Sequence, residues 1–278
     1  MNTTFYKYRK IDKPASLRNG CSLQKALQDN PSLDALFKCE AVFSGRRNFT
    51  DLFDSKIDLV RPSPAELFNL RSQIYAIKGL DISKFFADRN FTSSGEKFLI
   101  DFEIGFSEII DSYPIYCVSK HCTSNLLWAH YASGHEGFCI EIEFNENNCP
   151  KPVVYQKNIY AIGIIEFIKY NCGLVDKENL NERVHKALHV KLEEWYPEEE
   201  YRLIGSGLDK GQNFIKIPYN SKKTQGSLCP IIKSVIFGCR MPDHIEQFIM
   251  KNIPFRTTFK KAIARKDSIE IESIATLV

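Results

Sequence analysis

The segment Trp195-Tyr196-Pro197-Glu198-Glu199-Glu200-Tyr201-Arg202 indicates both a strand and a site, because it joins acids, an arginine and aromatic rings to a following apolar pair. Side chains alternate between the two faces of a strand, so Glu198, Glu200 and Arg202 should share one face. Two carboxylates and a guanidinium in one row are costly to bury unless they are paired, and such rows occur at functional sites. The alternative interpretation is a strand edge whose charges face water.

A second informative segment runs from Trp128 to Gly137. The residues that follow it, 138–144, alternate between apolar and acidic, and this alternation predicts a half-buried strand. Ser124 is suited to cap a short helix, on which Trp128 and Tyr131 would lie three residues apart on one face. Aromatic residues at this spacing are more often core residues than ligand contacts. His135 follows in a glycine-flanked turn, and loops beside rigid elements often carry function, so His135 is the better candidate.

These segments, together with others, resemble the bacterial family catalogued as domain of unknown function 2971. The matching motifs occur in the order of the family pattern and span most of the chain. They are Tyr6-Lys7-Tyr8-Arg9, Phe43-Ser44, Phe49-Thr50-Asp51-Leu52-Phe53-Asp54, the segment from Trp128 to Gly137, Val153-Val154-Tyr155, the segment from Trp195 to Arg202, and Ile232-Lys233-Ser234-Val235-Ile236-Phe237-Gly238.

Two positions depart from the family pattern. Thr50 stands where the family has Asn, and Leu52 stands where it has Pro. A ligand contact made by that Asn in the family would therefore be altered in this chain. The resemblance supplies no reaction, so function has to be argued from the chemistry of the residues.

The composition predicts a single α+β domain over residues 1–278. With 44% hydrophobic and 12% aromatic residues, the chain has enough apolar side chains for a substantial core. The net charge of +3, from 37 basic and 34 acidic residues, does not by itself indicate nucleic-acid binding. No apolar run approaches the ~20 residues that span a bilayer, and the N-terminus has no signal-peptide pattern. We expect a cytoplasmic protein with no membrane partner.

No metal site is predicted. The nine cysteines include no Cys-x-x-Cys pair, and the group Cys117, His121 and Cys122 lacks a second ligand pair at suitable spacing. His185 and His189 are four residues apart on an expected helix and could bind a metal. The acid of the zinc-protease pattern is not nearby, so a solvated helix face is expected instead. Free thiols in a reducing cytosol are the expected state of the cysteines.

The hydrophobic pattern predicts the elements in outline. Helices are expected over residues 22–28, 63 to about 77, 94–112, about 177–194 and 243–251. Strands are expected over residues 5–9, 38–44, 113–118, 137–144, 153–156, around 162–168, 199–204, 233–238 and 268–274. The polar stretch 205–227 is the best candidate for a long loop, and long loops are often lids or binding loops. Helices and strands in separated runs favour an α+β fold with a mixed, mostly antiparallel split sheet and flanking helices, similar to ADP-ribosyltransferases.

The first functional hypothesis is an ADP-ribosyltransferase-like enzyme that uses NAD as a co-substrate. Glycosyl transfer needs a carboxylate to stabilise an oxocarbenium-like transition state, a role for Glu200 or else Glu198, beside Arg202. A small nucleotide would bind to the other candidates, namely Tyr8, Arg9, Ser44, Asp51, Trp128, Tyr131 and His135. The acceptor would be a protein or a nucleic acid, in a toxin or phage-defence role. One cleft should collect Tyr8, Arg9, Asp51, His135, Glu198 and Arg202.

Two alternatives remain open. A metal-dependent nuclease or phosphodiesterase would hold Mg²⁺ with carboxylates, drawn from Asp51, Asp54, Glu198 and Glu200. A non-catalytic module would sense a nucleotide or a protein partner through Trp128, Tyr131 and His135. NAD consumption, metal-dependent cleavage of nucleic acid, or ligand binding without turnover would distinguish the three.

Overall fold

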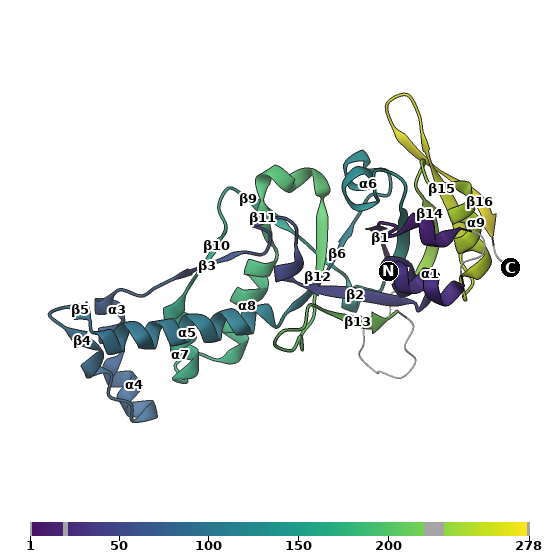
Figure 1. Cartoon of the computed structure of the whole chain (residues 1–278). Coiled ribbons are helices and arrows are strands. Elements are labelled where there is room, and N and C mark those ends of the chain that lie inside the picture. The colour runs from purple at the N-terminus through teal and green to yellow at the C-terminus, as the bar shows by residue number, and fades with distance from the viewer. Residues whose placement is uncertain (1, 19–21, 220–230, 277–278) are drawn as a thin grey trace.

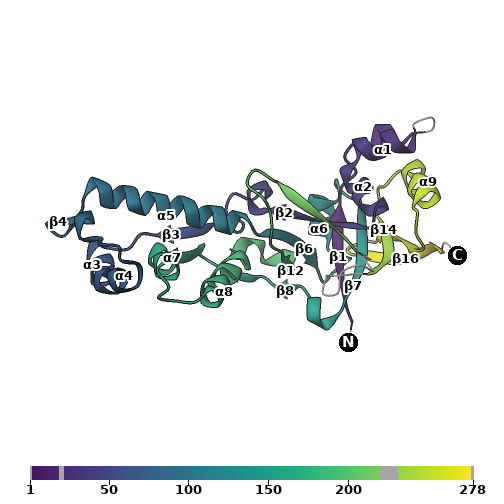
Figure 2. The same cartoon turned by 90° about the horizontal axis from the view of Figure 1, so that it is seen from below.

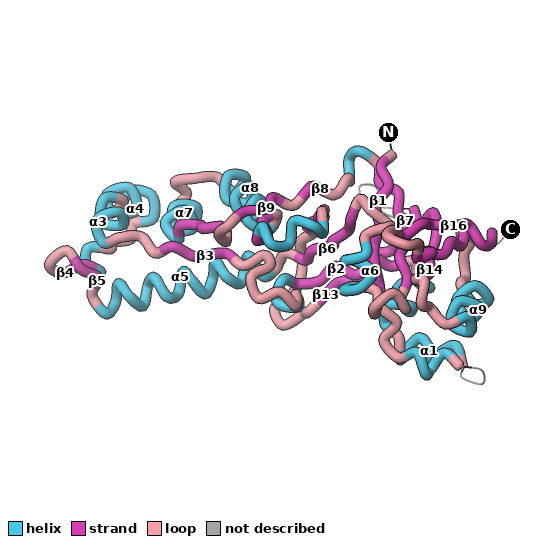
Figure 3. The backbone as a smooth tube through the Cα atoms, turned by 90° about the horizontal axis from the view of Figure 1, so that it is seen from above, coloured by secondary structure: helices cyan, strands magenta, loops and turns pink. Residues whose placement is uncertain are grey.

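The computed structural model describes residues 2–18, 22–219 and 231–276, apart from the side chains of residues 231, 275 and 276. The molecule is elongated, with a sheet region that holds both ends of the chain and an arm in which helices predominate (Figures 1 and 3). The helices are α1 (Leu23–Asp29), α2 (Pro31–Phe37), α3 (Pro64–Asn69), α4 (Arg71–Lys78), α5 (Ser93–Asp111), α6 (Asn125–Tyr131), α7 (Ile164–Asn171), α8 (Lys177–Leu188) and α9 (Asp243–Asn252).

The main sheet has the strand order β13-β2-β6-β1-β7-β14-β15-β16; off this path, β12 pairs with β6, and β8 pairs with β12. Its strands are β1 (Thr3–Arg9), β2 (Glu40–Gly45), β6 (Pro114–Ser119), β7 (Phe138–Phe144), β8 (Lys151–Pro152), β12 (Glu200–Ile204), β13 (Phe214–Pro218), β14 (Ile231–Phe237), β15 (Thr258–Ala264) and β16 (Ile269–Thr276). Within the described residues, neighbouring strands of this sheet are antiparallel except β14 and β15. The expected mostly antiparallel α+β fold is confirmed.

Short strand pairs complete the arm. They are β3 (Ile57–Val60) with β10 (Tyr160–Gly163), β9 (Val154–Gln156) with β11 (Val190–Leu192), and β4 (Phe86–Ala87) with β5 (Asn90–Phe91). Short 3₁₀ helices lie at Pro14–Leu17, Arg46–Asn48, Ser83–Phe85, Glu146–Asn148 and Glu193–Glu198. The pairing of β9 with β11 matters for function, because it fixes the segment that leads into β12.

Strand β6 is the point at which the sheet opens. It pairs with β12 along residues 115–119, which occupies one of its edges. On the other edge, β2 pairs with the start of β6 through Ser44 and Gly45, and β1 pairs with its end at the single position Tyr6–Ser119. Strands β1 and β2 therefore diverge, and no strand of the described part of the chain pairs with the middle of β6 on that side.

Hydrophobic clusters cover the sheet and run into the arm. One cluster packs α1, α2 and α9 against the sheet around Phe5, Ile142 and Phe259 (Figure 2). A second cluster places α6 on β1, β7 and β14 through Trp128 and Tyr8. A third joins α5, α7 and α8 to Ile115 of β6, so that the arm is packed against the sheet at the point where the sheet opens.

Several expected elements differ from the structure. The apolar run 162–168 is not one strand, because β10 ends at Gly163 and α7 begins at Ile164. Helix α8 ends at Leu188, since the residues after it pair with β9 as β11. The helix capped by Ser63 breaks at Leu70 into α3 and α4.

Several observed strands were not expected from the sequence, and β13 and β15 are the two long ones in the main sheet. Part of the expected long loop forms β13, which pairs with β2, and residues 220–227 of that loop lie outside the described residues. Strand β15 is also additional, and it pairs with both β14 and β16. None of the helices in the described part of the chain is both long enough and apolar enough to cross a membrane.

Candidate functional site

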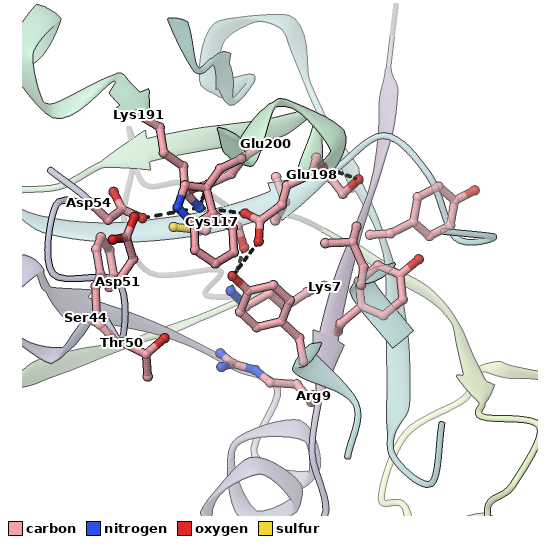
Figure 4. Close-up of a pocket in the computed structure, with 18 of the residues that line it drawn as sticks. Lys7, Arg9, Ser44, Thr50, Asp51, Asp54, Cys117, Lys191, Glu198 and Glu200 are labelled. Atoms are coloured by element: carbon pink, nitrogen blue, oxygen red, sulfur yellow. Dashed lines mark hydrogen bonds and ion pairs between the residues drawn. The ribbon is translucent and has the colours of Figure 1, made fainter. Parts of the chain in front are cut away.

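A pocket of about 370 Å³ lies where β1 and β2 diverge over β6 (Figure 4). Strand β1 contributes consecutive residues, β6 contributes its last three, and the loop after β2 and the segment before β12 close the remaining sides. The lining residues are Tyr6, Lys7, Tyr8, Arg9, Lys10, Ser44, Asn48, Phe49, Thr50, Asp51, Asp54, Cys117, Val118, Ser119, Leu127, Tyr131, Lys191, Trp195, Glu198 and Glu200. The volume is within the usual range for small-molecule sites.

Lys191 forms the centre of a buried charge cluster at one side of this pocket. Its Nζ lies 2.5 Å from Glu198 Oε2, 2.9 Å from Glu200 Oε2 and 3.4 Å from Asp54 Oδ2. The lysine and the two glutamates are each less than 10% exposed. Burial of these charges costs desolvation free energy. Direct pairing between the ammonium and the carboxylates offsets that cost, as buried charges require.

Arg202 supports the same cluster from behind the pocket. Its Nε donates to Glu200 Oε1 at 2.7 Å, and Nη2 donates to Asp54 Oδ1 at 2.6 Å. Its Nη1 donates to Ser55 Oγ and to the carbonyl of Leu188, both at 2.7 Å. The guanidinium is fully buried and is absent from the pocket lining, so Arg202 is a positioning residue.

These contacts decide the charge states of the cluster. Burial alone would raise the pKa of Glu200, but the charges of Arg202 and Lys191 outweigh it and hold the pKa well below its ordinary value. Burial would lower the pKa of Lys191, but Glu200, Asp54 and Glu198 outweigh it and raise the pKa. Glu200 is therefore ionised and Lys191 is an ammonium over the whole physiological range.

Glu198 is held between two side chains at the edge of this cluster. The Tyr131 hydroxyl donates to Oε1 at 2.7 Å, while Lys191 binds Oε2. Burial, together with the charge of Glu198, raises the pKa of Tyr131 far above its ordinary value, so the hydroxyl keeps its proton. Tyr131 is 41% exposed and comes from α6, so it joins the cluster to the open side of the pocket.

The β1 wall carries positive charge with little compensation. Lys7 and Arg9 are two residues apart in the strand and line the pocket. Among the described residues, the Arg9 guanidinium has no hydrogen-bond or ion-pair partner, and Lys7 Nζ contacts the carbonyl of Cys117 at 2.6 Å. Burial and the charge of Arg9 lower the pKa of Lys7 to about 8.

Two buried polar atoms of the lining have no hydrogen-bond partner among the described residues. They are Asp51 Oδ2, an acceptor, and Trp195 Nε1, a donor. Asp51 Oδ1 is bound by the backbone N–H of Phe53 at 2.9 Å, so its side chain is fixed in place. Unpaired buried polar atoms are costly, and binding of a polar ligand in the pocket is a physical reason for them to be retained.

The structure brings together most of the residues selected from the sequence. Tyr8, Arg9, Ser44, Asp51, Tyr131, Glu198 and Glu200 line the pocket. Three others lie elsewhere: Arg202 behind the cluster, Trp128 in the core and His135 in the turn before β7. The hypothesis that His135 shares the cleft does not fit, since its backbone binds Trp128 and Arg240 and its side chain is absent from the lining.

Trp128 acts through packing. Its ring is fully buried and meets Tyr8 edge-on at 5.0 Å, and its Nε1 donates to the carbonyl of Cys122 at 2.8 Å. Tyr8 in turn donates to the carbonyl of His121 at 2.8 Å. These contacts fix β1 and α6 relative to each other, so the aromatic pair positions the two walls that carry Arg9 and Tyr131.

Steric contacts explain why Gly137, two residues after His135, is a glycine. A Cβ at Gly137 would lie 2.2 Å from the Arg9 carbonyl oxygen and 2.9 Å from backbone atoms of Ala132. The end of β1 therefore passes against the turn after α6 at a separation that only glycine permits. Of the two departures from the family pattern, Thr50 lines the pocket and Leu52 is exposed.

Lys191 and Lys7 are the site residues that sequence reasoning missed. Lys191 falls in a stretch whose polar pattern predicted a continuing helix, and no local signal placed it beside the acids. Lys7 stands inside the Tyr6-Lys7-Tyr8 motif but was given no role. The signal available for Lys7 was its spacing from Arg9, which puts both on one face of a strand.

The charges of Glu198, Glu200 and Arg202 are buried and paired. The alternative interpretation, a strand edge whose charges face water, does not fit this geometry. Asp54, Glu198 and Glu200 surround one point, and the Lys191 ammonium occupies it. A Mg²⁺ ion bound by these carboxylates would have to displace that ammonium. The metal-dependent nuclease hypothesis therefore receives no support from the donor set.

Residues 127–203 match a family model described as protein of unknown function (DUF2971). Over this segment, which is less than half of the chain, the sequence is similar to that family. The DUF2971 segment contains Tyr131, Lys191, Glu198, Glu200 and Arg202, so it supplies the acidic side of the pocket. Strand β1 and the loop after β2 lie outside it. Searches of curated proteins and of solved structures found no match.

Proposed function

We propose that the pocket binds NAD and that the protein cleaves its N-glycosidic bond and transfers ADP-ribose. The observation that carries this proposal is Glu198, a buried carboxylate at the pocket, held by the Tyr131 hydroxyl and the Lys191 ammonium. Cleavage of the bond to nicotinamide develops positive charge on the ribose. A fixed carboxylate stabilises that charge without reorganisation during the reaction.

Glu198 is better suited to this role than Glu200. One oxygen of Glu200 accepts from Arg202 Nε, and the other accepts from Lys191 and from Arg202 Nη2 at 3.3 Å. Its charge is therefore compensated on both sides. Glu198 Oε1 accepts from the neutral Tyr131 hydroxyl, so part of its charge remains available for a developing cation.

The rest of the pocket suits the polar groups of a dinucleotide. The Arg9 guanidinium and Lys7 supply positive charge for a diphosphate, which guanidinium groups bind through paired hydrogen bonds. Asp51 Oδ2 and Trp195 Nε1 are a free acceptor and a free donor for ribose hydroxyl or amide groups. The acceptor of ADP-ribose would be a protein or a nucleic acid, and the setting would be a toxin or a phage-defence effector.

The test is release of nicotinamide from NAD by the purified protein, with cell lysate as a source of acceptors. Glu198→Gln should lower turnover by about 10²–10³ while calorimetry shows that NAD still binds. Glu199→Gln is the matched control, since Glu199 is the adjacent carboxylate, pairs with His121 at 2.8 Å and is absent from the lining. It should leave turnover unchanged.

The outcomes separate the alternatives. NAD binding without nicotinamide release would identify a non-catalytic nucleotide-binding module. A wild-type protein that neither binds nor consumes NAD would refute the proposal. Equal loss of turnover in Glu198→Gln and Glu199→Gln would refute the assignment of Glu198.

A further inference from the structure

Two lysines line the same pocket in opposite surroundings. Lys191 lies among three carboxylates, at 2.5, 2.9 and 3.4 Å. Lys7 has no carboxylate within ion-pair distance among the described residues, and its Nζ meets the Cys117 carbonyl at 2.6 Å and lies 5.0 Å from the Tyr116 ring centroid. Lys191 is held as an ammonium by carboxylates, whereas among the described residues Lys7 has only a neutral carbonyl as its hydrogen-bond acceptor.

The charged and titratable groups facing Lys7 come from four strands. They are Arg9 of β1, Cys117 of β6, Cys139 of β7 and Glu200 of β12. Burial and Arg9 favour the neutral amine and outweigh the opposing effect of Glu200, which leaves the pKa at about 8. At pH 7.5, the free-amine fraction of Lys7 is then roughly 200-fold larger than that of an ordinary lysine.

A free amine in a pocket is a nucleophile towards carbonyl carbon. Within residues 2–18, 22–219 and 231–276 the neighbouring Arg9 guanidinium has no partner, and it would bind a phosphate group on the same ligand. We propose that Lys7 forms an imine with an aldehyde or ketone that also carries a phosphate. This role goes beyond NAD cleavage and does not depend on it.

The reaction balances without an oxidant or a metal. The Lys7 nitrogen attacks the carbonyl carbon and forms a carbinolamine, and the carbon–oxygen bond then breaks. Both amine hydrogens leave with the carbonyl oxygen as water, and a carbon–nitrogen double bond remains. The step is reversible, so the ligand can leave by hydrolysis.

Pyridoxal 5′-phosphate is a suitable probe, because it combines an aldehyde with a phosphate. The wild-type protein is treated with limiting reagent at pH 7.5, reduced with borohydride and mapped by peptide mass spectrometry. Lys7 should be modified first, and Lys191 should remain unmodified. Modification of Lys7 no faster than that of an exposed lysine such as Lys210, which is 84% exposed, would overturn the proposal.

Three comparisons give the test its specificity. The rate of Lys7 modification should rise with pH around a midpoint near about 8, and a midpoint near 10.5 would contradict the proposal. Pyridoxal without the phosphate should react at least about tenfold more slowly, and Arg9→Gln should abolish that preference. Lys7→Arg keeps a charge but cannot form the adduct, and circular dichroism confirms its folding. No outcome depends on NAD consumption.

Discussion

Lys191 Nζ donates a 2.9 Å hydrogen bond to Glu200 Oε2, although the two residues lie in different strands of different sheets. This contact joins the short β9–β11 pair to the main sheet by charge. The contact also places the Lys191 ammonium, which keeps its proton, next to the carboxylates of Glu198 and Glu200. The charge cluster is therefore as much a part of the fold as of the site.

Replacement of Lys191 by Met should lower the free energy of unfolding by about 3–5 kcal/mol, because three buried carboxylates would lose a shared counter-charge. Urea denaturation of the two proteins measures the difference. Lys210→Met is the control: Lys210 pairs with Glu108 at the surface, so its loss should cost less than about 1 kcal/mol. Equal costs for the two variants would show that the cluster is solvated.

Arg202→Ala should destabilise the fold by a similar amount, about 3–5 kcal/mol, since it leaves Glu200 and Asp54 with less compensation. Arg202→Lys should recover part of the loss only, because an ammonium cannot reproduce contacts to two carboxylates, Ser55 and the Leu188 carbonyl. Thermal melts measure both. A lysine variant as stable as wild type would mean that charge alone matters.

Stability should depend on the titration of Lys7. Its pKa is about 8 in the folded protein and is ordinary, near 10.5, in the unfolded chain. Between these values the unfolded chain binds more protons, so this residue makes stability rise with pH. The stability difference between wild type and Lys7→Met should therefore move in favour of wild type from pH 8 to 10.5.

Chemical denaturation at several pH values measures that difference. Lys10→Met is the matched control, because Lys10 follows on the same wall and is 65% exposed. The difference for Lys7→Met should change more between pH 8 and 10.5 than the difference for this control. An equal change in the two variants would show that the Lys7 amine stays protonated in the fold.

Two glycines should respond in opposite directions to substitution by Ala. Gly137→Ala forces a Cβ against the Arg9 carbonyl and should destabilise by about 1–3 kcal/mol. Gly105 lies inside α5, where a Cβ would meet Phe167 at an ordinary 3.7 Å, so Gly105→Ala should stabilise by about 0.5–1 kcal/mol. Calorimetric melts test both, and a stabilised Gly137→Ala would contradict the close approach.

The strands of the central sheet could be predicted because their patterns repeat every second residue. Strands β1, β6, β7 and β12 were expected close to their observed bounds. The run 162–168 was assigned wrongly, since a short continuous apolar run fits a strand and a buried helix equally well. Gly163 marks the actual boundary, and only the pairing of β10 with β3 decides it.

The site could be predicted where its residues lie in motifs, as for Tyr8, Arg9, Glu198 and Glu200. Lys191 could not, because its role depends on three contacts that exist only after β11 pairs with β9 and the arm packs against the sheet. Asp51 lies outside the matched family segment, but it belongs to the motif of residues 49–54, and from that motif we expected it in the cleft, where it lines the pocket. Trp128 was expected among the ligand-binding residues, but its ring lies in the core, and its spacing from Tyr131 could not tell which of the two would face the pocket.

The divergence of β1 from β6 has a consequence for how the pocket would tolerate mutation. Beyond Tyr6, strand β1 has β7 on one side and the pocket on the other, so a stretch of sheet edge faces the interior of the molecule. Peptide groups on such an edge can pair with a ligand much as they pair with a strand. Side-chain substitutions leave these backbone peptide groups in place. Variants that lose the charged side-chain contacts should therefore retain a measurable affinity for a ligand through the backbone.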